Sequence, residues 1–396
     1  MAITSTRRGF LSALGLAAGA LAAPTAIAQG AGTTAATADA VARDYAALVH
    51  AAYADTLASA ADLQAAIRAL LAQPSAATMA AARAAWVEAR EFYGQTEAFR
   101  FYGGPIDDDK GPEGRLNSWP LDESYIDYVK GKPGAGIVGK RQVVISKASL
   151  AQLNERGGEE NIAAGWHAIE FLLWGQDLSA DGPGDRPVED YIEGKGPNAD
   201  RRRQYLSVVT ELMLDDLRML VTAWQPDARN YREQFQRGGM ESIRKIIVGL
   251  GSLSRGELAG ERMEVALNTQ DQEDEHSCFS DNTHRDIVNS ALGIENVWLA
   301  RYQRRDGSLL QGVSLRALVA TTDTALAERV TRQIGASVQA ARAIQPPFDR
   351  EIIGDRDAPG RLRIQKTIDS LVQQSKVLAE VATALGIKRL TLAKKK

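Results

Sequence analysis

The chain of 396 residues is predicted to be an all-α protein. Three observations predict this class. Hydrophobic residues recur with helical spacing, alternating strand-like patterns are nearly absent, and glycine and proline gather between the periodic segments. Helices joined in this way usually form antiparallel bundles, so we expect two pseudo-repeated helical bundles of about four helices each. Long structured loops rich in glycine, proline and aspartate should connect them.

The helices follow from the hydrophobic stripes and from the proline or glycine residues that end them. In the first half, the predicted helices span 41–71, a segment through Trp86 towards Phe101, a segment opening at Asn161 or a neighbouring glutamate, and Arg201–Trp224. In the second half, they span Met240–Leu253, Ile287–Tyr302, Leu315–Ala343 and a final stripe from Ile364 to Leu385.

The N-terminus has the features of an export signal. Arg7 and Arg8 precede an apolar stretch rich in alanine and leucine, and an Ala-Ile-Ala run at 26–28 supplies a cleavage site. A transmembrane anchor fits less well, because the apolar stretch is short and is interrupted by Pro24. We therefore predict a twin-arginine signal peptide and a periplasmic location for the mature protein.

Composition narrows the class of protein further. Cys278 is the only cysteine, so no intrachain disulfide can form and no cysteine at the cleavage site can carry a lipid anchor. The formal net charge is −3 and no basic face is evident, which argues against nucleic acid as a partner. Because no later stretch is long and apolar enough to span a membrane, we expect a soluble mature protein.

The mature chain is long enough for two domains of ordinary size. We predict the signal peptide over 1–28, a disordered linker over 29–40, a first helical bundle over 41–224 and a second helical bundle over 225–390.

The run Gly-Trp-His-Ala-Ile-Glu at 165–170 carries the clearest chemical signal. His167 and Glu170 are three residues apart, so they share one face of a helix. Their neighbours are strongly apolar, and a charged pair in such surroundings needs a partner. A bound cation would be one, and a hydrogen-bonded pair within the core is the alternative. Gly165 would allow another backbone or a ligand to approach closely.

Two further polar segments of the first half are candidates for the same site. Glu97 and Arg100 have the same three-residue spacing amid aromatic residues, although an ordinary intrahelical ion pair would also explain them. Ser118 and Asp122 flank Pro120, where either could instead cap the following helix.

An acidic segment over 271–284 contains His276 and His284. Acidic runs are usually solvated loops, but the two interspersed histidines favour attraction of a cation. Comparison with 117–127 also suggests a duplication. It pairs three identical residues, namely Ser118 with Ser277, Asp122 with Asp281, and Asp127 with Asp286.

These motifs resemble the imelysin family, whose hallmark is Gly-x-His-x-x-Glu, here Gly165, His167 and Glu170. Similar flanking runs are Thr96-Glu-Ala-Phe-Arg-Phe-Tyr, Pro105-Ile-Asp, Asn117-Ser-Trp-Pro-Leu-Asp-Glu and Ala168-Ile-Glu-Phe-Leu-Leu-Trp-Gly-Gln-Asp. The acidic segment is similar to the iron-regulated protein A branch. The resemblance covers essentially the whole mature chain. It implies two pseudo-symmetric bundles, a polar site where they meet, and a periplasmic protein connected with iron supply.

The favoured hypothesis is a protein of iron acquisition that binds a metal ion or a metal chelate between the bundles and works with other iron-uptake proteins of the envelope. Nitrogen and oxygen ligands suit a divalent or ferric ion, such as iron or zinc. The candidate metal ligands are His167, Glu170, Glu97, His276 and His284. The candidates for contact with a bound group are Arg100, Ser118, Asp122, Ser277 and Asp281. Arg100 would position a carboxylate or an anionic chelator through its planar guanidinium.

Two alternatives remain open. The family was named for an insulin-cleaving metallopeptidase, and a zinc peptidase would need three protein ligands and a general base. Neither of the two common helical zinc signatures is present. The run His-Glu-x-x-His does not occur, and its inverted form would need histidine where Phe171 stands. His276 or His284 would then supply a third ligand, and Glu170 would be ligand or base. The second alternative is an envelope adaptor without metal, in which His167 and Glu170 form a buried pair.

Overall fold

The computed structural model describes residues 35–179 and 181–388. The helices and strands in this part of the chain are, in order, α1 (Ala38–Ala72), α2 (Ala76–Thr96), η1 (Glu97–Phe99), α3 (Glu113–Leu116), α4 (Glu123–Ile126), α5 (Gly136–Gly139), α6 (Lys147–Leu153), α7 (Gly165–Trp174), η2 (Val188–Tyr191), α8 (Ala199–Trp224), α9 (Tyr231–Gln236), α10 (Met240–Ser252), η3 (Leu253–Glu264), α11 (Val265–Thr269), η4 (Gln272–Asp274), α12 (Thr283–Leu299), β1 (Arg301–Gln303), β2 (Leu309–Gln311), α13 (Leu315–Ala320), α14 (Thr324–Ala343), α15 (Asp349–Ile352) and α16 (Pro359–Ala384).

The prediction of an all-α fold is confirmed. Within the described residues, β1 and β2 are the only strands, and they form a small antiparallel hairpin in which Arg301 pairs with Gln311. The signal peptide predicted over 1–28 lies outside the described residues. Helix α1 begins at Ala38, inside the predicted linker over 29–40, because the Thr37 side chain caps it by accepting from the backbone N–H of Ala40.

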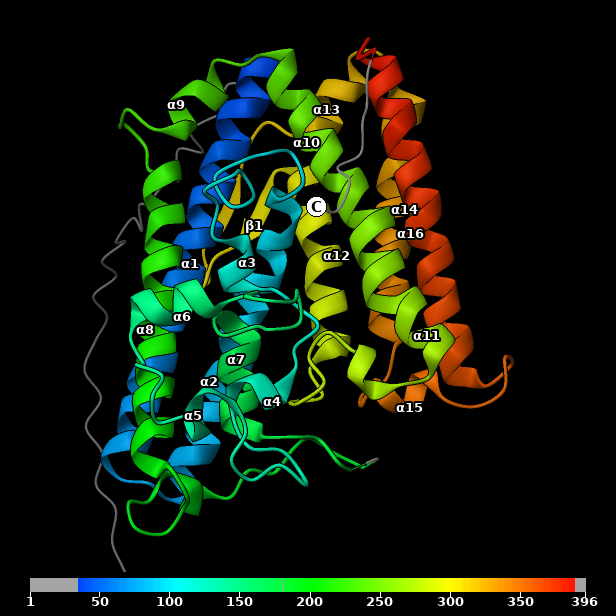
Figure 1. Ribbon diagram of the computed structural model, residues 1–396. Helices are drawn as coiled ribbons and strands as arrows, with labels where there is room; N and C mark the ends of the chain where they lie inside the picture. The colour runs from blue at the N-terminus through cyan, green and yellow to red at the C-terminus, as the bar shows by residue number, and fades with distance from the viewer. Residues whose placement is uncertain (1–34, 180, 389–396) are drawn as a thin grey trace, which may run out of the picture. The chain divides into compact units, whose positions relative to one another are not determined.

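The helices of residues 35–388 pack as one compact unit. Helices α1 and α7 each contact both α2 and α8, and α16 contacts α10, η3 and α14. Figure 1 shows α14 and α16 side by side and α12 running between them and the helices of the first half. Helix α12 contacts both α2 and α14, so it links the two groups of helices. The division of the chain at 224/225 stays a prediction.

Several predicted boundaries were wrong, and each has a local cause. The helix predicted to Tyr302 ends at Leu299, after which the chain turns into β1. The helix predicted over 315–343 is two helices, because Asp323 caps a new one by accepting from the backbone N–H of Leu326. The helix that carries His167 begins at Gly165 rather than near Asn161.

Helix α10 ends at Ser252, within one residue of the predicted Leu253, but the chain then continues directly into the π-helix η3, which was not predicted. Gly256 and Gly260 lie in this stretch and weaken its α-helical preference. π-Helices are rare, and the single π-turns that occur within α-helices are frequently found at functional sites.

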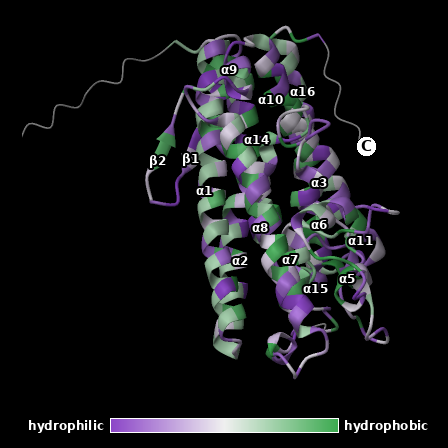
Figure 2. Cartoon of the chain, turned by 60° about the vertical axis from the view of Figure 1, so that its left-hand side comes forward, coloured by the Kyte–Doolittle hydropathy of each residue, from purple (hydrophilic) through white to green (hydrophobic). Residues whose placement is uncertain are grey.

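The long helices are amphipathic, and Figure 2 shows hydrophilic and hydrophobic residues mixed along them. Helix α7 is different, because every residue from Gly165 to Trp174 is buried. Its polar side chains therefore have to find their partners inside the protein. None of the helices in the described part of the chain is both long enough and apolar enough to cross a membrane.

Candidate functional site

The start of α7 is fixed by close backbone packing. Gly165 has φ +87°, a conformation that favours glycine, and a Cβ atom there would lie 2.4 Å from the carbonyl oxygen of Leu116. The close approach expected at this glycine is therefore made by a backbone segment. That contact places the segment before Asn117 directly against the helix that carries His167.

His167 and Glu170 form a buried pair on α7. The Nδ1 atom of His167 lies 2.8 Å from Oε2 of Glu170. The other oxygen of Glu170 accepts hydrogen bonds from the backbone N–H of Ser280 at 3.0 Å and from its hydroxyl at 2.7 Å. Burial raises the pKa of Glu170 to about 8, so this carboxyl group holds a proton at neutral pH. The pair is thus tied to the acidic segment of the second half.

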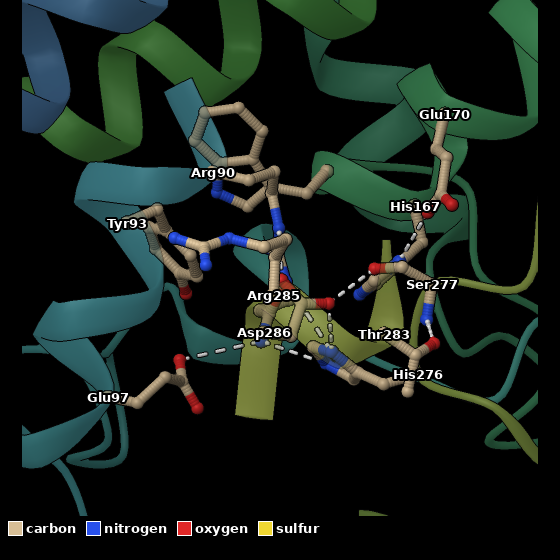
Figure 3. Close-up of polar contacts among 12 residues, drawn as sticks. Arg90, Tyr93, Glu97, His167, Glu170, His276, Ser277, Thr283, Arg285 and Asp286 are labelled. Carbon is tan, nitrogen blue, oxygen red and sulfur yellow. Dashed lines mark hydrogen bonds and ion pairs between the residues drawn. The ribbon is translucent and has the colours of Figure 1, made fainter. Parts of the chain in front are cut away.

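His276 forms a second pair with Asp286, the carboxylate of α12. The Nδ1–H group of His276 donates to Oδ2 of Asp286 at 2.8 Å, and Ser277 donates its hydroxyl to the same oxygen at 2.5 Å. Arg90 of α2 donates to the other carboxylate oxygen at 2.9 Å. Although burial opposes ionisation, the Arg90 guanidinium holds the pKa of Asp286 well below its usual range. Figure 3 shows these residues converging from α2, α12 and the acidic segment.

The two pairs lie against each other. The ring centroids of His167 and His276 are 4.6 Å apart, with the ring planes at 74°. The Nε2 atom of His167 is buried and has no hydrogen-bond partner within the described part of the protein. The Nε2 atom of His276 lies 3.4 Å from Nδ2 of Asn117. Burial lowers the pKa of His276 to about 4, and it lowers the pKa of His167 well below its usual range. Both imidazoles are therefore neutral at neutral pH, as metal ligands are.

Glu97 and Arg100 also meet, but within a network of charges. Glu97 accepts from Arg100 at 2.5 Å and from Arg262 of η3 at 2.6 Å. Burial alone would raise the pKa of Glu97, but these two guanidinium groups outweigh it and lower the pKa to about 2. Arg100 also pairs with Glu113 at 2.7 Å and lies 3.8 Å from Glu257. Its charge is thus already balanced by carboxylates of the protein.

An open cavity of about 950 Å³ lies beside His276, which forms part of its wall together with Asn117, Ser118 and Trp119. Much of the remaining wall carries carboxylates, which we call the acidic lining. Its members are Asp107, Asp108, Asp109, Glu113, Glu155, Glu159, Glu257 and Glu261. The last two come from η3, so the π-helix supplies one side of the cavity.

The other predicted residues lie at different places. Ser118 lines the cavity and donates its hydroxyl to Glu155 at 2.7 Å. Asp122 is the N-cap of α4 and accepts from the backbone N–H of Ser124, which is the capping role left open by the sequence. His284 donates from Nδ1 to the backbone carbonyl of Asp281 at 3.1 Å.

Asp281 belongs to a separate acidic group. Its side chain interacts electrostatically with the carboxylates of Asp177 and Asp349, and Arg350 offsets them in part. Burial and these like charges raise the pKa of Asp281 to about 7. In the described part of the chain, no three histidine, cysteine, aspartate or glutamate side chains are arranged to hold a metal ion.

Sequence reasoning missed Arg90, Asn117 and Ser280. A signal for Arg90 was present, because it falls on the same helical stripe as Trp86 and Tyr93 and all three are buried. A charged residue on an apolar stripe indicates a buried ion pair. Asn117 and Ser280 lie in loops, where the sequence has no periodicity that shows which side chains point inwards.

The fold and the site together define an all-α protein with two adjacent histidine–carboxylate pairs next to an acidic cavity. The imelysin family model, Peptidase_M75, matches residues 49–378, so the chain belongs to the imelysin family. The chain is 28% identical over 327 residues to iron-regulated protein A of Synechococcus elongatus, covering 80% of this chain and 78% of that protein. The fold is similar to the crystal structure of a protein from Parabacteroides distasonis assigned as an iron-regulated protein A precursor. The TM-score is 0.69 at 21% identity, covering 90% of this chain and 97% of that one.

Proposed function

We propose that this imelysin-family chain is an exported protein of iron handling that binds a metal cation through the Nε2 atoms of His167 and His276. The observation that carries this proposal is the shared geometry of the two histidines. Each has its Nδ1 atom in contact with a carboxyl group. For Nε2 to bind a metal, Nδ1 must carry the ring proton, so metal binding at His167 releases one proton from the His167–Glu170 pair. At His276 the metal takes the place of the contact between Nε2 and Asn117. Carboxyl groups behind histidine ligands orient the imidazole in this way in many metal sites.

This proposal revises the role expected for Glu170. Both of its oxygens are engaged, one by His167 and the other by Ser280, and the side chain is fully buried. We therefore assign Glu170 to orienting His167 rather than to direct metal binding. Asp286 has the corresponding role behind His276.

The ligand chemistry favours a divalent ion. Imidazole nitrogens suit iron, zinc, copper and nickel, whereas the harder ferric ion prefers oxygen ligands. Two imidazole ligands leave the remaining coordination positions of the ion to water or to other ligands that the ion carries. A site of this kind suits an ion that is taken up and passed on, and the similarity to iron-regulated protein A favours iron as that ion.

The peptidase alternative has less support from the geometry. A general base has to lie within reach of the water that it activates. Glu170, the candidate base, is fully buried, and both of its oxygens are engaged by His167 and Ser280. We therefore do not propose proteolysis as the activity.

Cobalt(II) absorption tests the proposal, because the visible spectrum of this ion reports nitrogen ligands. We expect the purified protein to bind Co²⁺, and Fe²⁺ under anaerobic conditions to compete with it. His167→Ala and His276→Ala should each abolish the cobalt spectrum, while circular dichroism checks that both variants remain folded.

His284→Ala is the matched control. This histidine lies close to His276 in sequence, but it is held against the backbone carbonyl of Asp281, whereas the ring contact with His167 is made by His276. It should leave the cobalt spectrum unchanged. Equal binding by wild type and both test variants would refute the assignment of the two ligands.

A further inference from the structure

The cavity beside His276 bears on the form in which a metal reaches the proposed site. This inference rests on the proposed function, and it concerns the charge of the species that enters. His276 forms part of the cavity wall, and the ring of His167, whose Nε2 atom is buried and unpartnered within the described residues, packs against the ring of His276. The cavity therefore gives solvent access to the proposed ligand His276, whereas His167 packs against His276 without lining the cavity.

The charge of the cavity is strongly one-sided. Eight carboxylates form the acidic lining, whereas Arg115 supplies the one guanidinium or ammonium group among the described residues that line the cavity. Arg115 is itself paired with Asp216, its Nη2 atom lying 2.6 Å from Oδ1. Clefts lined by charges of one sign concentrate ions of the opposite sign.

Arg100 offsets only part of this charge, because two members of the acidic lining, Glu113 and Glu257, share its guanidinium with Glu97. The sequence suggested that its guanidinium receives an anionic chelator, but three carboxylates of the protein surround it, those of Glu97, Glu113 and Glu257. An anionic complex would have to displace these ion pairs and then face the acidic lining at close range. Like charges brought together in a partly desolvated site disfavour binding.

The size of the cavity allows a hydrated ion to enter. A water molecule occupies about 30 Å³ in the liquid, so the cavity, at about 950 Å³, accommodates a metal ion together with its hydration shell. Carboxylates at the entrance can then hold the hydrated cation before its water is exchanged for imidazole. Glu155 and Glu159 are exposed members of the acidic lining and lie on the loop after α6.

We propose that the cavity admits its metal as a hydrated divalent cation and rejects anionic iron chelates, with the acidic lining as the determinant of this specificity. The acidic lining does not replace the histidines as ligands. It raises the local concentration of the cation, so its removal slows association while the spectrum of the bound ion stays the same.

Stopped-flow measurement of Co²⁺ binding at low ionic strength tests this proposal with the double variant Glu155→Gln/Glu159→Gln. We expect association to slow by roughly threefold to tenfold, since charge focusing of this kind raises on-rates by 10-fold or more. Added salt should reduce the difference from wild type, because it screens exposed charges. The cobalt spectrum at saturation should not change.

The control Glu88→Gln/Glu189→Gln removes the same number of charges at exposed positions that do not line the cavity. It should bind Co²⁺ at the wild-type rate. In a parallel competition, ferric citrate serves as the anionic chelate and should not displace Co²⁺.

Two results would overturn the specificity proposal alone. These are an unchanged association rate in the cavity variant and displacement of Co²⁺ by ferric citrate, in each case with the histidine-dependent cobalt spectrum intact. Absence of that spectrum in the wild-type protein would instead overturn the proposed function, and the inference with it. The two failures are therefore distinguishable in one set of measurements.

Discussion

His167 and His276 come from opposite halves of the chain, and their ring centroids lie 4.6 Å apart. The carboxyl groups behind them differ in protonation. Asp286 is held ionised by Arg90, whereas burial keeps Glu170 protonated at neutral pH, with a pKa of about 8. The two neutral histidines are therefore paired with carboxyl groups in different protonation states. The first two predictions below follow from this difference.

Asp286→Asn should destabilise the protein strongly. It leaves Arg90 buried without a charged partner, and breaking a buried ion pair from one side costs about 3–5 kcal/mol. Unfolding in urea measures this change in free energy. Asp215→Asn removes an exposed carboxylate that pairs with Lys147 and Arg218, and it should cost less than about 1 kcal/mol. Similar losses in the two variants would contradict the buried network.

Glu170→Gln should gain stability relative to wild type as the pH rises. The folded pKa of Glu170 is raised from 4.5 to about 8, so its stabilising contribution is complete below pH 4.5 and is lost as the pH rises towards 8. Glutamine does not titrate. The difference in unfolding free energy should therefore shift towards the variant between pH 4.5 and 8, by at most about 1.4 kcal/mol per pH unit. If the unfolding free energies of the two proteins changed in parallel with pH, the pKa of Glu170 would not be raised in the folded protein.

Glu97→Gln should have the opposite pH dependence. The folded pKa of Glu97 is lowered from 4.5 to about 2, so its contribution is complete above pH 4.5 and is lost as the pH falls towards 2. The variant should be most destabilised, relative to wild type, above pH 4.5, and this cost should shrink on acidification. Urea unfolding between pH 3 and pH 7 measures the trend. Glu88→Gln, at an exposed position, should change stability by less than about 0.5 kcal/mol throughout.

Gly165→Ala should destabilise the start of α7. A methyl group there would clash with the backbone of Leu116, and the positive φ adds strain of about 1–3 kcal/mol. Thermal unfolding should show a clear decrease in Tm, and the cobalt spectrum should weaken because His167 lies two residues further on. Gly182→Ala is the matched control, since its Cβ would meet open space and its φ is not positive. An unchanged Tm for Gly165→Ala would mean that the backbone contact is not required.

Local features of the sequence were sufficient for much of this protein. The helical class, most helix positions and the shared face of His167 and Glu170 followed from periodicity, because the geometry of a helix relates residues three and four apart. The π-helix η3 and the hairpin after Leu299 were missed, since nothing in the periodic pattern separates them from an ordinary α-helix.

The tertiary structure decided which polar residues meet. Asp122 caps a helix, Arg100 is balanced by carboxylates, and His276 rather than His284 lies against His167. Sequence spacing cannot show these relationships, because they depend on contacts between segments far apart in the chain. The sequence therefore determined which residues could carry chemistry. Only the packing of α2, α7 and α12 around the acidic segment determined which of them share one buried site, because burial and charge pairing depend on neighbours that the chain order does not reveal.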